Sequence, residues 1–165
     1  MNSVHTAGSH ARSARFPAAV FSRVPAAATR TGWLLLGLFC IGFAILEIVN
    51  HGPEALGLAA GFAIAPDLAM LVGAGGARSR QHGQLAPAAV PWYNAAHRAW
   101  VPLLLLVVYS VSPLTWAPLF AGGLGWLAHI AIDRAAGFGL RDAAGFQRTP
   151  HGRRADGAAA GGVRG

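Results

Sequence analysis

Residues 33–49 read WLLLGLFCIGFAILEIV and hold a single charged residue, Glu47. A helix that crosses a bilayer needs about 20 mainly apolar residues, with a range of roughly 17–25. With its flanking residues this stretch meets that length, and it lacks the charged face that a helix on a soluble bundle would show. It therefore predicts a transmembrane helix over residues 31–50.

Three further apolar runs follow along the chain and predict helices over residues 54–75, 88–112 and 114–136. Turn residues separate neighbouring runs, with His51-Gly52-Pro53 after the first run and Ser112-Pro113 after the third. The alternating pattern that a membrane β-barrel requires is missing. The sequence thus predicts an all-α fold, a four-helix transmembrane bundle.

The composition agrees with lipid as the solvent for most of this chain. Of the 165 residues, 54% are hydrophobic and 12% are charged, whereas soluble domains carry about 25% charged residues. We expect one membrane domain at 31–141 and a disordered cytoplasmic tail at 1–30. A second cytoplasmic tail is expected at 142–165, disordered at its end, because its composition cannot bury a core.

All 13 basic residues are arginines, and they lie in the two tails and in the 73–98 connection. Basic segments beside membrane helices stay on the cytoplasmic side. This predicts a multi-pass protein of the cell inner membrane with both termini in the cytoplasm. The net charge of +7 would also suit nucleic acid, but topology accounts for where the arginines lie. We therefore expect the lipid bilayer, and no nucleic acid, as the partner.

Six polar residues form the candidate functional cluster, namely Asp67, Tyr93, Asn94, His97, His129 and Asp133. Ionisable groups inside a bilayer are costly and usually face a cavity or a partner. At 1.5 Å per residue, Asp67 lies about 18 Å into the second predicted helix from its outer end. His129 and Asp133 lie about 21 and 27 Å into the fourth. The remaining three begin the third helix, so the cluster is expected in the cytoplasmic half of the bilayer or at its edge.

The spacing within this cluster suggests a metal site or a proton relay. His129 and Asp133 are four residues apart and share one helix face, as do Tyr93 and His97. A carboxylate one turn from a histidine can accept its ring N–H and fix the tautomer. Imidazole and carboxylate ligands suit zinc or a similar divalent ion. The predicted ligands are His97, His129, Asp67 and Asp133.

The same residues have structural alternatives. Asp67 follows Pro66, which cannot donate a backbone hydrogen bond, so its carboxylate could cap a second half-helix. His97 and Asn94 could serve only as hydrogen bonds between helices. Asp133 could be an ordinary interface residue that ends the fourth helix, followed by the snorkelling side chain of Arg134.

Gly57 and Gly61 form a Gly-xxx-Gly pair on the second predicted helix. Small residues at this spacing let helix backbones approach closely. The pair predicts a packing face, either within the chain or in a homodimer.

Several short motifs resemble, in order, the landmarks of one family: PDLAML at 66–71, YNAAH at 93–97, LAHIAIDR at 127–134, GFGLR at 137–141 and GF at 145–146. The chain resembles, over about residues 31–153, a family of small bacterial integral membrane proteins known as a domain of unknown function. The resemblance implies a four-helix membrane domain and no assigned activity. It also implies an acid where Leu35 or Leu36 stands. It further implies a histidine where Pro150 stands here, so that this histidine is either lost or displaced by one residue to His151. If those groups serve an active centre, this member is impaired.

Three functions stay open on these residues. The first is a structural or accessory membrane protein of unknown function, in which the polar cluster serves helix packing. The second is a metal-dependent membrane hydrolase, in which a metal-bound water attacks a lipid-borne or small substrate. The third is a proton-coupled small-solute transporter, in which the histidines and aspartates relay protons.

Overall fold

The computed structural model describes residues 25–72 and 81–148, and the elements named within these ranges are all helical. They are α1 (Ala26–Leu68), the 3-10 turns η1 (Ala69–Leu71) and η3 (Pro87–Ala89), α2 (Val90–Ala96), α3 (Trp100–Val111) and α4 (Ala117–Ala136). The predicted all-α class is confirmed for this part of the chain. Three parts of the chain lie outside the described residues, namely 1–24 of the predicted N-terminal tail, 73–80 of the arginine-bearing connection, and 149–165, which includes Pro150.

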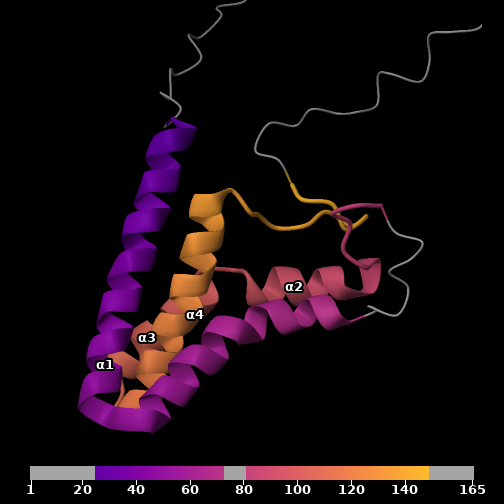
Figure 1. Cartoon of the computed structure of the whole chain (residues 1–165). Coiled ribbons are helices and arrows are strands. Elements are labelled where there is room, and N and C mark those ends of the chain that lie inside the picture. The colour runs from indigo at the N-terminus through magenta and orange to yellow at the C-terminus, as the bar shows by residue number, and fades with distance from the viewer. Residues whose placement is uncertain (1–24, 73–80, 149–165) are drawn as a thin grey trace, which may run out of the picture.

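Helix α1 consists of two arms joined by a sharp bend at Gly52 (Figure 1). Gly52 has φ 71° and ψ −152°, a conformation that is essentially restricted to glycine. Pro53 then begins the next helical stretch, where its missing N–H has no intrahelical partner to lose. We call residues 26–51 the first arm and residues 53–68 the second arm. The bend coincides with the predicted turn, and the two arms diverge from it as a V.

Helix α4 packs against both arms of this V (Figure 1). The closest approach is at Gly125, where a Cβ atom would lie 2.2 Å from the carbonyl oxygen of Ala59 in the second arm. On the first arm, a Cβ at Gly37 would lie 2.8 Å from Cδ1 of Ile132. Glycine at these crossings lets helix surfaces touch, so α4 sets the position of one arm relative to the other.

The predicted packing pair, Gly57 and Gly61, lies away from this contact. Both residues are exposed, and among the described residues nothing lies within 4 Å of a Cβ built on either. The close approach within the chain uses Gly122 and Gly125 of α4 instead. The reason is that the second arm turns its Ala59 face, and not its glycine face, toward α4. Contact between two copies of the chain through Gly57 and Gly61 stays a prediction.

The single helix predicted over 88–112 is divided into α2 and α3. Pro102 accounts for the interruption, because a proline ring clashes with the carbonyl four residues before it and offers that carbonyl no N–H. Side chains of α4 bind the carbonyl groups at the interruption. Trp126 Nε1 donates to the carbonyl of Ala96 at 2.8 Å. Arg134 Nη2 donates to the carbonyl of His97 at 3.0 Å.

The segment after α4 folds back over the loop that precedes α2. Helix α4 ends at Ala136 and is capped by Gly137, whose φ of 94° is the left-handed conformation that glycine favours. A bridge between Arg141 and Gln147 closes a short turn, and Leu85 N–H donates to the carbonyl of Gly145 at 3.0 Å. The first residues of the predicted C-terminal tail are therefore part of the folded unit.

Two helical stretches are long and apolar enough to cross a membrane, Ala26–Leu71 and Pro87–Val111. The first of them includes both arms of α1. Large apolar side chains are exposed along these helices, among them Leu35 at 62% and Val111 at 80%. Extensive apolar exposure of this kind marks a surface that meets a membrane or a partner, which supports the predicted membrane association.

Candidate metal site

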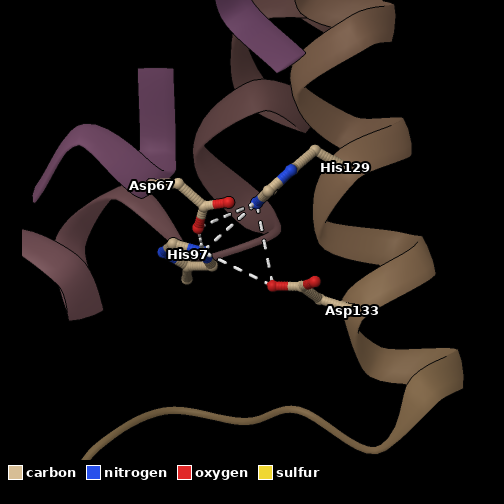
Figure 2. A group of neighbouring side chains, drawn as sticks. All are labelled: Asp67, His97, His129 and Asp133. Carbon is tan, nitrogen blue, oxygen red and sulfur yellow. Dashed lines mark hydrogen bonds and ion pairs between the residues drawn. The ribbon is translucent and has the colours of Figure 1, made fainter. Parts of the chain in front are cut away.

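Four of the predicted site residues converge where α1, α2 and α4 meet (Figure 2). Asp67 stands near the end of α1, His97 follows α2 directly, and His129 and Asp133 lie one turn apart on α4. One possible ligand atom from each residue lies within 4.8 Å of the other three. We call these four residues the tetrad.

The polar atoms of the tetrad face a common centre. The Nε2 atoms of His97 and His129 lie 3.3 Å apart. His97 Nε2 is 3.5 Å from both Asp67 Oδ1 and Asp133 Oδ2. His129 Nε2 is 3.6 Å from Asp67 Oδ1 and 3.7 Å from Asp133 Oδ2. Figure 2 shows the two rings and the two carboxylates pointing toward one another.

A hydrogen bond on the side of the ring opposite the tetrad centre fixes the orientation of the buried His97 side chain. Its Nδ1 atom lies 2.9 Å from the carbonyl oxygen of Tyr93. A carbonyl can only accept a hydrogen bond, so Nδ1 carries the proton, and in the neutral ring Nε2 presents a lone pair to the centre. Metal-ligating histidines typically donate their second ring N–H in this way.

Tyr93 and Asn94 lie behind the tetrad and not within it. The Tyr93 ring stacks on His97 with centroids 3.8 Å apart and an angle of 21° between the planes. Asn94 binds the backbone of Arg141 twice, donating to its carbonyl at 2.9 Å and accepting from its N–H at 2.8 Å. The Arg141 guanidinium carbon lies 5.5 Å from the centroid of the Tyr93 ring. The two residues therefore tie the C-terminal segment to the helix that positions His97.

The helix-capping alternative for Asp67 is not observed. Helix α1 continues through Pro66 to Leu68, and η1 begins with no side-chain cap. The Asp67 side chain is 46% exposed and faces the two histidines. Asp133 likewise faces them, with 26% of its side chain exposed.

Sequence reasoning missed two side chains that support His97. Trp126 and Arg134 hold the end of α2 through the carbonyls of Ala96 and His97, as described above. Arg134 was expected only as a cation at the membrane interface. No sequence signal identifies its role, because its acceptor is a backbone carbonyl 37 residues away.

Comparison with known protein families identifies the family to which the chain belongs. Residues 33–153 match the family described as a domain of unknown function, DUF4260. The chain belongs to this family. The match nearly coincides with the range of the resemblance and contains the whole tetrad. No curated protein and no solved structure matches the chain. The DUF4260 description assigns no activity.

One of the two departures noted in the sequence falls within the described residues of this DUF4260 member. Leu36, where the resemblance implies an acid, is partly buried against an apolar cluster that includes Cys40 and Leu127. Leu35 is exposed. At this position the chain offers an apolar contact in place of the carboxylate that the resemblance implies.

Replacement of Asn94 by alanine is expected to destabilise the folded protein by about 1–3 kcal/mol, because it leaves the partly buried backbone N–H and carbonyl of Arg141 without this partner. The measurement is reversible unfolding by denaturing detergent, followed by circular dichroism. Asn50, exposed at the end of the first arm, provides the matched control. An Asn94→Ala protein as stable as Asn50→Ala would contradict the support role of Asn94.

Proposed function

We propose that this DUF4260 protein is a metal-dependent hydrolase of the membrane, with a single divalent ion bound by the tetrad. The observation that carries the proposal is the direction of His97. Because Nδ1 donates to the Tyr93 carbonyl, Nε2 of the neutral ring presents its lone pair to the two carboxylate oxygens. The two carboxylates and this lone pair repel one another, and a cation at their centre removes the repulsion.

The distances within the tetrad support a tetrahedral ion. Zinc ligands at about 2.0–2.2 Å in a tetrahedron lie roughly 3.3–3.6 Å from each other. Five separations between ligand atoms of the tetrad, from 3.3 to 3.7 Å, agree with this edge length. Two carboxylates also balance the charge of a divalent ion, so the loaded site would be neutral. Neutrality matters in a low-dielectric setting, where an uncompensated charge is costly.

Exposure suggests different roles for the four residues. His97, His129 and Asp133 have 3%, 14% and 26% of their side chains exposed, and we assign them as permanent ligands. Two histidines and one carboxylate are a ligand set found in catalytic zinc sites that keep one position open. The side chain of Asp67 is 46% exposed and belongs to α1, whereas the other three ligands belong to α4 and to the end of α2. We assign its carboxylate as the group that yields the fourth position to water and accepts a proton.

A divalent metal at this site would lower the pKa of a bound water to about 7 and make it a nucleophile at neutral pH. Asp67 would accept one proton from the water, while the oxygen of the water forms a bond to the carbonyl or phosphoryl centre of the substrate. The bond from this centre to the leaving oxygen then breaks, and Asp67 returns the proton to the leaving oxygen. In sum, water adds across one ester bond.

The membrane setting is part of the proposal. We infer four spanning segments, namely the two arms of α1, the α2–α3 stretch and α4, with both termini in the cytoplasm of a cell with an inner membrane. The arginine distribution supports this orientation, and the exposed apolar side chains on α1 and α3 support contact with lipid. The tetrad would then lie toward the cytoplasmic side, where Arg134 and Arg141 stand.

The test is the metal content of the purified protein in mild detergent, measured by mass spectrometry of the elements. Wild type is expected to carry about one divalent ion per chain, and a His97→Ala, His129→Ala double variant is expected to carry none. A His51→Ala, His82→Ala double variant is the matched control, since both of these histidines are exposed.

Wild type without stoichiometric metal, even after dialysis against zinc, would end the proposal. A proton shared within the tetrad, as the transporter hypothesis requires, would then be the better account of the cluster.

A further inference from the structure

An apolar groove of about 420 Å³ lies beside the tetrad, between the two arms of α1 and α4. Each arm and α4 contributes one helix face to its lining. Of the thirteen lining residues, eleven are apolar or glycine, and the other two are His129 and Asp133. The groove and the proposed metal site therefore share two side chains.

Small side chains create this space where the arms diverge. Ala44, Ala60, Ala63 and Ala128 line it, so neither arm fills the gap beside α4. Larger aliphatic side chains form the walls, namely Ile41, Ile45, Ile48, Leu56 and Ile132. The volume falls in the range of about 300–1,000 Å³ that is usual for small-molecule sites.

The two ends of the groove differ in polarity. Ile48 and Leu56, each four residues from Gly52, are the lining residues nearest the bend in the chain. Asp133 stands at the other end, near the C-terminus of α4, which points away from the bend (Figure 1). A molecule lying along the groove would thus have one end among aliphatic side chains and the other end at the tetrad.

We propose that the groove binds the hydrocarbon tail of an amphiphilic ester, such as a lipid, whose scissile bond lies at the tetrad. This inference rests on the proposed hydrolase and names its substrate class. A lining that offers polar groups only at His129 and Asp133 gives water few hydrogen-bond partners and suits a chain of methylene groups. A membrane supplies such chains at the mouth of the groove.

The experiment uses a fatty acid with a photoreactive diazirine at the end of its tail. The purified full-length chain in detergent is irradiated with this probe, and the labelled peptides are identified by mass spectrometry. We expect the label on peptides that include Ile48 or Leu56, and we expect excess unlabelled fatty acid to compete it away.

Filling the groove should remove this labelling. Ala60→Trp, with Ala63→Leu as a smaller second variant, is expected to lower labelling about tenfold, which is the effect of excluding roughly two methylene groups. Ala65→Trp is the matched control, because Ala65 is exposed on the same arm and does not line the groove. Size-exclusion chromatography of each variant checks that it is folded.

Label spread over the exposed apolar surface, not competed and unchanged by the filling variants, would overturn the inference. Metal content measured on the same samples separates it from the proposed function. Bound metal without groove labelling would support the metal site and contradict binding of a lipid tail in the groove. Groove labelling that is competed away, in protein without metal, would support binding of the tail and contradict the hydrolase proposal.

Discussion

Substitution of Gly125 by valine is expected to prevent α4 from packing on the second arm and to cost more than about 3 kcal/mol. A Cβ at this position would lie 2.2 Å from the carbonyl oxygen of Ala59, and backbone on both sides cannot move away as a flexible side chain would. Overpacking of a core typically costs about 1–3 kcal/mol, and here the obstacle is a rigid helix. The protein purified in mild detergent should aggregate on size-exclusion chromatography or unfold at a much lower concentration of denaturing detergent.

Gly61→Val is the matched control for this change. It adds the same side chain to the same helix pair, but within the described residues nothing lies within 4 Å of the added Cβ. Its effect should stay within about 0.5 kcal/mol, as for other surface substitutions. Equal losses in the two variants would mean that the contact between α4 and Ala59 is not the one described.

Removal of metal is expected to lower the thermal unfolding midpoint of the wild-type protein substantially. The tetrad joins α1, the end of α2 and α4, so an ion held there binds only the folded chain. A ligand at about 1,000 times its Kd stabilises the folded state by roughly 4 kcal/mol. The measurement is thermal unfolding in detergent with zinc and after treatment with a chelator.

The His97→Ala, His129→Ala variant should show no difference between these two conditions, because it has lost both nitrogen ligands. Its midpoint should resemble that of the chelated wild type. A wild-type midpoint that does not respond to zinc or chelator would contradict a metal at the tetrad and agree with a packing role for these residues.

The helical character of the chain could be predicted because apolar runs of sufficient length leave few alternatives. The turn at Gly52 was also visible, since glycine followed by proline ends one helix and starts another. The interruption before α3 was not predicted, although Pro102 is its cause. In an apolar run a proline can either kink a helix or divide it. Here the division between α2 and α3 is stabilised by Trp126 and Arg134 of α4, which donate hydrogen bonds to the free carbonyl groups.

The packing of α4 between the arms could not be predicted for a different reason. Small residues occur on both faces of the second arm, and sequence spacing drew attention to Gly57 and Gly61. The face that meets α4 carries Ala59 instead. A small side chain is equally suited to a helix contact and to lipid, so only the three-dimensional arrangement distinguishes the two faces.

The sequence allowed the tetrad residues to be placed near one another, because the depth of each residue along a predicted membrane helix follows from the rise of about 1.5 Å per residue. Asp67, His97 and the α4 pair were expected at similar depth, and the structure brings them together. The separate role of Tyr93 and Asn94 was not expected. Their position behind His97 depends on the C-terminal segment folding back to Arg141, a contact that no local pattern encodes.

The bend at Gly52 also has a consequence for biosynthesis. Both arms leave the ribosome long before α4, and their contacts with α4 join residues far apart in the chain, which slows folding. Until α4 arrives, the Ala59 carbonyl surface and the aliphatic walls of the groove have no protein partner. Chains that stop short of α4 would expose these surfaces and lack His129 and Asp133, so neither the groove nor the tetrad can form until α4 has been synthesised.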